Sequence, residues 1–215
     1  MVNAIILFIV AVAFGVFGAM MGWSYITVIG IIIGLTILNI LFYLLILTNS
    51  KDLKLITYVL KVNRKEPLFG YLLTLKDGNL EDAKLQLEKG IKKYKSNQNG
   101  PQFSFSLALL NNDVTAARHA ALSFKDAGFR EYALATIDCY EGKGEQHFST
   151  VFSKPWMHHA LVATNAFFKD DQDTYKQHKQ FTLDHSKGLQ LASNTYSFQF
   201  NEQLYPDGYP IQSTI

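Results

Sequence analysis

The chain has 215 residues, of which 48% are hydrophobic, with one cysteine and a formal net charge of +2. One cysteine cannot build a disulfide scaffold or a cysteine-based zinc site, and a net charge of +2 is not the basic surface that binds nucleic acid. The charge is unevenly distributed, because residues 1–50 contain no Asp, Glu, Lys or Arg and all 38 charged residues fall in 51–215. We therefore expect an apolar leader followed by a soluble part large enough for its own core.

Two apolar runs in residues 1–50 predict a transmembrane helical hairpin. The first span covers about residues 4–21 and the second about residues 26–47. At 1.5 Å per residue these helices are roughly 27 and 33 Å long, enough to cross a hydrocarbon core of about 30 Å. A signal peptide is the alternative, but Met1–Asn3 carries no Lys or Arg and the apolar sequence resumes at once. The short connection makes the two helices antiparallel neighbours.

Glycines in both spans suit close helix packing. Gly18 and Gly30 each lie six residues from Ser24 in the connection, and a second glycine follows each of them after four residues. Such G-x-x-x-G pairs let helix backbones approach each other, either between chains or within the hairpin. The matched depth favours packing within the hairpin. The candidate packing residues are Gly15, Gly18, Gly22, Gly30 and Gly34.

A basic segment, residues 51–65, follows the second span. Its five basic residues and one acidic residue give a net charge of +4, whereas the connection between the spans is uncharged. Positive residues beside a span stay in the cytoplasm, so we expect both termini on the cytoplasmic side of the cell membrane. The candidate membrane-surface residues are Lys51, Lys54, Lys61, Arg64 and Lys65.

The same segment is amphipathic. Leu53, Ile56 and Leu60 recur at helical spacing, opposite the basic side chains. Two interpretations remain open: a juxtamembrane helix with its apolar face in the anionic leaflet, or the first core helix of the soluble domain.

Helical periodicity continues from Glu66 and is interrupted by short polar clusters. No run of β-branched and aromatic residues bounded by turn pairs predicts a sheet. The sequence therefore predicts an all-α domain over residues 66–200. We expect residues 201–215 to form an extended C-terminal tail, because Pro206 and Pro210 exclude a helix there.

A repeat is visible inside this domain. Gly78–Ala83 aligns with Asn112–Ala117, and the same offset relates Pro67 to Pro101. This offset of 34 residues equals the repeat length of the tetratricopeptide-repeat family, whose unit is a helix–turn–helix. Over residues 66–129 the pattern resembles that family.

The resemblance implies an α-solenoid-like fold with a concave surface for protein partners. It also implies that the small side chains of Ala83 and Ala117 allow close helix packing and that Leu87 fills a large apolar position. A compact helical domain that is not a solenoid is the alternative.

No catalytic or cofactor motif is present in the sequence. His158 and His159 are adjacent, so on a helix they point about 100° apart and cannot chelate one ion together. His178 and His185 are seven residues apart, wider than the i, i+4 spacing of metal-binding helices. Cys139 lies within a helical pattern and is expected to be a buried apolar residue. We expect no metal, no cofactor, no small-molecule substrate and no enzymatic activity.

These observations predict a membrane-anchored cytoplasmic helical-repeat adaptor or scaffold of a bacterial membrane. Its partners are expected to be the lipid bilayer and one or more proteins that it recruits. The alternative is a small regulatory or assembly subunit of a larger membrane enzyme, transporter or secretion complex.

Overall fold

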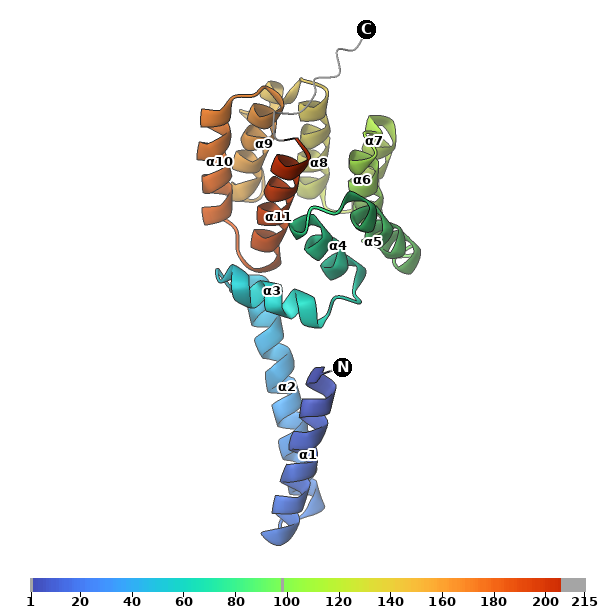
Figure 1. The fold of residues 1–215 in the computed structure, drawn as a ribbon, viewed down its shortest axis with the longest axis vertical. Helices are drawn as coiled ribbons and strands as arrows, with labels where there is room; N and C mark the ends of the chain where they lie inside the picture. Colours follow the sequence, from blue (N-terminus) through green and yellow to red (C-terminus); the bar gives the residue numbers. More distant parts are fainter. Residues whose placement is uncertain (1, 98, 206–215) are drawn as a thin grey trace.

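The computed structural model describes residues 2–97 and 99–205, and these form helices and connecting turns without any β-strand (Figure 1). The all-α prediction is confirmed. The elements in chain order are α1 (Val2–Met20), α2 (Tyr25–Asn49), α3 (Leu53–Val62), α4 (Pro67–Lys76), α5 (Leu80–Lys93), α6 (Gly100–Leu110), α7 (Val114–Leu122), α8 (Ala127–Tyr140), the 3₁₀ helix η1 (Gly144–His147), α9 (Pro155–Phe168), α10 (Gln172–Asp184) and α11 (Gly188–Leu204).

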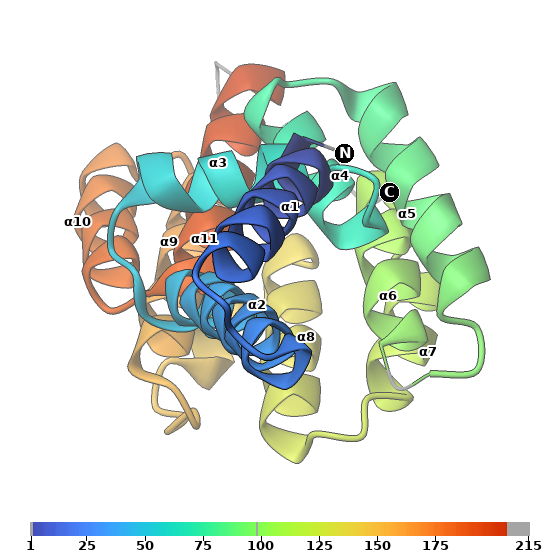
Figure 2. The ribbon, with the colours of Figure 1, turned by 90° about the horizontal axis from the view of Figure 1, so that it is seen from below.

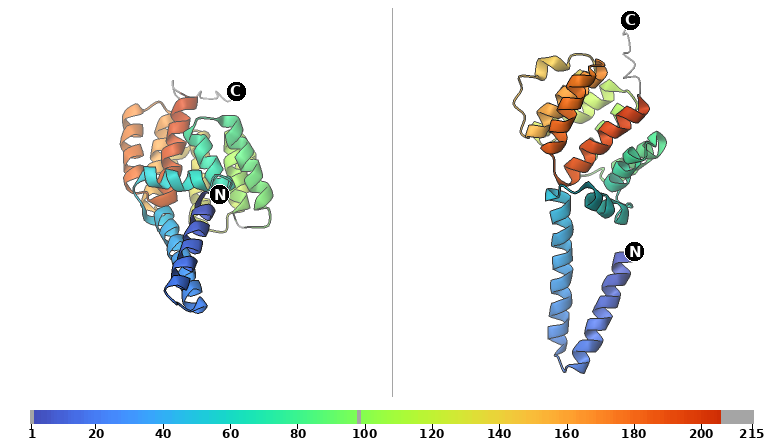
Figure 3. Two further views of the ribbon diagram at one scale, coloured as in Figure 1. Left: turned by 60° about the horizontal axis from the view of Figure 1, so that its bottom comes forward. Right: turned by 60° about the vertical axis from the view of Figure 1, so that its left-hand side comes forward.

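Helices α1 and α2 project from the other helices as a stalk and are joined at its far end (Figure 3). Gly22 makes the turn with a positive φ of 68°, and Ser24 caps α2 by accepting a hydrogen bond from the Thr27 N–H. Helix α2 is long and apolar enough to cross a membrane, with a mean hydropathy of 2.6 over an 18-residue window. Only 6% of that window is buried, so this stretch of α2 does not lie in the core of a domain. The apolar stretch Ala11–Met20 of α1 is shorter.

Matched depth predicts that the glycines of α1 and α2 pack between the two helices, but only Gly18 lies in close contact with the other helix. Gly18 is buried, and a Cβ there would lie 2.7 Å from Val28 Cγ2 on α2. Gly15, Gly30 and Gly34 have no neighbour within 4 Å of where a Cβ would stand. The reason is that α1 and α2 diverge from their turn (Figure 3), so equal depth does not bring glycines face to face.

Helix α3 belongs to the core of the helical domain. Asp52 caps it by accepting hydrogen bonds from two backbone N–H groups. Ile56, Val59 and Leu60 are at most 1% exposed and pack in one cluster with residues of α2, α4 and α11. The apolar face is therefore covered by protein, which decides between the two interpretations of this segment. The five basic residues singled out in the sequence remain exposed: Lys51, Lys54, Lys61, Arg64 and Lys65.

Three helix pairs, α4–α5, α6–α7 and α9–α10, share one turn design. A residue in the left-handed conformation ends the first helix: Gly78 (φ 70°), Asn112 (φ 55°) or Asp170 (φ 56°). The next residue caps the second helix with a side-chain oxygen that accepts a backbone N–H three residues on. The residues predicted to pack between helices, Ala83, Leu87 and Ala117, are at most 1% exposed.

After α8 the pattern changes, because the short helix η1 and a loop precede α9 where a second long helix would be expected. The last helix, α11, then packs back against α4, α3 and α2. Its buried residues Ala192, Tyr196 and Phe200 join the cluster that contains α3, and the Tyr196 hydroxyl lies 2.5 Å from that of Thr57.

Helix α11 also corrects the boundary of the C-terminal tail. The sequence predicts an extended segment over residues 201–215, but α11 continues to Leu204. Pro206 and Pro210 lie outside the described residues.

The start of α11 is fixed against the end of α2. The Gly188 N–H donates a 2.7 Å hydrogen bond to the Ser50 carbonyl, and Lys51 Nζ donates to the Asp184 carbonyl at 3.0 Å. Gly188 has a φ of 54°, and a Cβ there would overlap the Leu47 carbonyl oxygen. Only glycine combines this backbone conformation with so close an approach.

Gly188→Ala is expected to lower the free energy of unfolding by about 1–3 kcal/mol more than Gly142→Ala. Gly142 is the matched control, because it also has a positive φ (74°) but has open space where its Cβ would stand. The two variants therefore share the cost of the left-handed backbone, and only Gly188→Ala adds the overlap with α2. Urea unfolding of the full chain in detergent, followed by circular dichroism, measures the difference. Equal destabilisation of the two variants would show that the contact with α2 contributes nothing.

Candidate interaction groove

A groove of about 450 Å³ is lined by residues of helices α4, α6, α8, α9 and α11. The groove residues come from these inner helices and from Phe124, just after α7. Helices α5 and α10 contribute none of them, so they lie on the outer side. In the view from below (Figure 2), α5 and α10 lie at opposite edges of the molecule. Inner and outer helices thus alternate along most of the chain.

The inner helices present the same positions to the groove. In α4 these are Leu68, Tyr71, Leu72 and Leu75, at the spacing i, i+3, i+4, i+7 that defines one face of a helix. The same spacing recurs in α6 at the repeat offset, and again in α8 after a shorter interval. Those residues are Gln102, Phe105, Ser106 and Leu109 in α6, and Phe129, Tyr132, Ala133 and Thr136 in α8.

The walls of the groove are mainly aromatic and aliphatic. Tyr132 and Trp156 meet edge to face, with ring centroids 5.3 Å apart, and Phe129 lies beside the same Trp156 at 6.4 Å. Helix α11 supplies the polar side, where Gln190 donates a 2.9 Å hydrogen bond to Asn194 Oδ1. The other polar groove residues of α11 are Ser193, Ser197 and Asn201.

None of the residues that line the groove within the described chain carries a charge. Tyr71 hydrogen-bonds Ser106 across α4 and α6, and burial raises the pKa of Tyr71 to about 12. Burial raises the pKa of Tyr132 as well. Both hydroxyls are protonated at neutral pH and can donate hydrogen bonds. The groove therefore offers apolar surface with hydroxyl and amide groups, which suits an uncharged, apolar segment of a partner.

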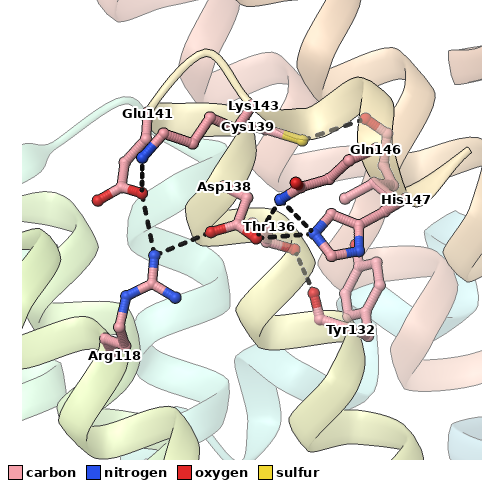
Figure 4. Close-up of polar contacts among 10 residues, drawn as sticks. Arg118, Tyr132, Thr136, Asp138, Cys139, Glu141, Lys143, Gln146 and His147 are labelled. Carbon is pink, nitrogen blue, oxygen red and sulfur yellow. Dashed lines mark hydrogen bonds and ion pairs between the residues drawn. The ribbon is translucent and has the colours of Figure 1, made fainter.

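A polar network on the opposite side of α8 holds this wall of the groove in place (Figure 4). Asp138 accepts hydrogen bonds from Arg118 Nη2 of α7 at 2.8 Å and from Gln146 Nε2 at 2.9 Å. His147 Nε2 of η1 lies 2.7 Å from the same carboxylate, and Arg118 also donates to Glu141 at 3.0 Å. One carboxylate thus connects α7, α8 and η1.

The electrostatics favour the ionised form of this carboxylate. Burial alone would raise the pKa of Asp138, but the hydrogen bonds from Arg118 and His147 outweigh it and hold the pKa below its usual value. The hydrogen bond to Asp138 in turn raises the pKa of Arg118. Asp138 is 9% exposed. Loss of its charge would therefore leave Arg118 and His147 without an ionised acceptor at this position.

The remaining polar groups behind α8 are tightly packed. Cys139 is 1% exposed, its thiol points at the Leu161 carbonyl, and burial raises its pKa to about 12, so it is protonated at neutral pH. A Cβ at Gly144 would lie 2.6 Å from Asn165 Oδ1, a buried atom that has no hydrogen-bond partner among the described residues. This region holds α8 and η1 together.

The residues that line the groove are not those singled out in the sequence. Ala83, Leu87 and Ala117 lie on the outer helices α5 and α7 and face other helices. The repeat offset is the signal that could have found the groove. It relates Tyr71 to Phe105 in the groove, just as it relates the turn at Gly78 to the turn at Asn112. Searches against protein families, curated proteins and solved structures find no match to this chain.

Asp138→Asn is expected to lower the free energy of unfolding at pH 7 by about 1–3 kcal/mol, the cost of weakened charge-assisted hydrogen bonds to Arg118 and His147. The pKa of Asp138 is lower in the folded chain, so its stabilisation is present above the unfolded-state pKa and is lost as pH falls through the folded-state value. The difference between variant and parent should therefore shrink as pH falls.

Urea unfolding of the full chain between pH 7 and pH 3 measures this dependence. Glu131→Gln is the matched control, because Glu131 is an exposed carboxylate on the same helix. A pH-independent difference for Asp138→Asn would show that the charge of the carboxylate is not what stabilises α8.

Proposed function

We propose that this chain is a membrane-anchored adaptor with a tetratricopeptide-like domain that binds a protein partner in the groove. The observation that carries the proposal is the recurrence of one groove-lining face, with the same internal spacing, in α4, α6 and α8. Successive helices that present equivalent positions to a shared concave surface are the basis of recognition in helical-repeat proteins.

In this proposal α1 and α2 are two membrane spans, with both termini and residues 51–215 in the cytoplasm. The exposed apolar length of α2 and the exposed basic side chains next to it support this topology. Because the apolar face of α3 is buried in the domain, the lysines and not the leucines of this segment meet the lipid headgroups.

The groove recognises an apolar, uncharged segment of the partner. Aromatic walls and a polar side of amides and hydroxyls bind such a segment without charge complementarity. We propose that recognition at this surface, and not catalysis, is the activity of the chain.

A second candidate is a small regulatory or assembly subunit that binds a larger membrane protein through the stalk. The uncovered glycines Gly30 and Gly34 of α2 favour it, because another helix can approach closely there. The two candidates differ in where the partner binds, in the groove or along α2.

A cysteine at position 92 tests the topology. Lys92 is exposed on α5, so Lys92→Cys places a reactive thiol in the proposed cytoplasmic domain, whereas native Cys139 is buried. We expect a maleimide that cannot cross membranes to leave intact cells unlabelled and to label the variant after permeabilisation. Labelling in intact cells would place the domain outside and overturn the proposal.

Photo-crosslinking distinguishes the two candidates. A crosslinking amino acid at Leu109 in the groove should capture a partner in intact membranes, whereas one at the exposed Ile33 of α2 should capture lipid. Ser193→Trp fills the groove and should reduce the capture at Leu109 at least tenfold, while Gln177→Trp on the exposed face of α10 should not. Protein capture confined to Ile33 would favour the subunit, and capture at Leu109 that survives Ser193→Trp would exclude the groove.

A further inference from the structure

Two histidines that are far apart in sequence meet between α9 and α10. His159 Nδ1 and His178 Nδ1 lie 3.1 Å apart, and both side chains are half-buried. Phe181 stacks on the His159 ring, with centroids 4.9 Å apart and planes 24° from parallel. The two nitrogen atoms are therefore held on defined helices and are not the ends of mobile surface side chains.

Two more imidazoles lie beside this pair. The His158 ring centroid is 5.4 Å from that of His159 and 6.5 Å from that of His178. The His185 ring stacks against His159 at 5.8 Å. Four of the six histidines of the chain are gathered on this one face of the α9–α10 pair.

The distance between the two Nδ1 atoms fits two kinds of pairing. If both rings are neutral and no ion is bound, one Nδ1–H donates to the lone pair of the other Nδ1. If both rings carry their proton on Nε2, both Nδ1 lone pairs can point at one shared ion. Tetrahedral zinc with bonds of about 2.0–2.1 Å places two nitrogen ligands roughly 3.3 Å apart, close to the observed separation.

We propose that His159 and His178 bind a divalent first-row transition-metal ion such as Zn²⁺ through their Nδ1 atoms. Imidazole nitrogen is a favoured ligand for Zn²⁺, Ni²⁺ and Cu²⁺, whereas Mg²⁺ requires oxygen. Within the described residues no three candidate ligands converge on one point as the side chains stand. Two histidines therefore hold the ion in this proposal, and water completes the coordination.

The protonation state of the pair is suited to a metal. Burial lowers the pKa of His159, and the neighbouring His178, His158 and His185 lower it further. Burial and His158 lower the pKa of His178 in the same direction. The neutral imidazole is the form that binds metal, and both shifts are in the direction that favours this form. His185 Nδ1 donates to the Phe181 carbonyl at 2.8 Å, which fixes this ring beside the pair.

The site would fasten the α9–α10 pair close to the attachment of α2, because His185 follows Asp184, whose carbonyl accepts the hydrogen bond from Lys51. A metal ion bound only by the folded chain raises its stability by mass action. This inference does not depend on the adaptor function, since neither His159 nor His178 is among the residues that line the groove.

Isothermal titration of the full, untagged chain in detergent with Zn²⁺ tests the proposal at pH 7. We expect one ion per chain, at least tenfold weaker binding in His159→Gln and in His178→Gln, and no saturable binding of Mg²⁺. His119→Gln is the matched control, because His119 is exposed on α7, and it should bind Zn²⁺ as the parent does. The thermal midpoint gives a second readout: Zn²⁺ should raise it by several degrees in the parent and not in His178→Gln.

Unchanged Zn²⁺ affinity in both His159→Gln and His178→Gln would overturn the site, as would the lack of saturable binding below about 100 µM in the parent, the order of magnitude of weak, accessible metal sites. The pair would then be an internal hydrogen bond only. Circular dichroism without metal shows whether each variant is folded before it is titrated.

Discussion

The hydrogen bond from the Gly188 N–H to the Ser50 carbonyl marks the contact on which the rest of the arrangement depends. It brings the start of α11 against the end of α2, in the space that a side chain at Gly188 would occupy. From this point α11 runs back along α3 and α4 and supplies the polar side of the groove. One helix therefore connects the apolar stalk to the surface proposed for the partner.

The spacing of the groove-lining faces along the chain follows the lengths of the outer helices. The step along the chain from Leu68 of α4 to Gln102 of α6 is longer than the equivalent step from Gln102 to Phe129 of α8. Helix α5 has 14 residues and α7 has 9, so the second outer helix is shorter by more than one turn. After α8 the outer position holds only the short η1, where Arg118, Gln146 and His147 converge on Asp138. The polar network thus replaces packing that a full outer helix would provide.

Local patterns in the sequence predict the helices and their turns well. Gly78 and Asn112 mark turns because both adopt the left-handed conformation that ends a helix, and the residue after each is a good cap. The apolar length of α2 is equally clear. Periodicity cannot tell a face that covers a cavity from one that covers a neighbouring helix, so it does not mark Tyr71 and Phe105 as groove residues.

The features that could not be predicted depend on contacts between distant segments. His159 and His178 meet only because α9 and α10 pack side by side, and their separation of 19 residues matches no local metal-binding spacing. For the glycines of the stalk, the sequence predicts contacts that the structure does not contain. Equal depth in two helices predicts contact only if the helices stay parallel, and α1 and α2 diverge.

The connection between the stalk and the domain determines what kind of adaptor the proposed function implies. Only Ser50–Asp52 separate α2 from α3, and Ile46 of α2 is 3% exposed within the same cluster as Ile56 and Tyr196. A flexible linker would let the domain search a volume around its anchor, with an effective concentration set by linker length. Here the end of α2 is part of the core of the domain, so packing fixes the direction in which α2 leaves the domain. In the proposed membrane anchor, a partner held in the groove is therefore held at a fixed height and orientation relative to the bilayer. This geometry suits an adaptor that positions its partner for a membrane process and does not suit one that only raises the local concentration of its partner.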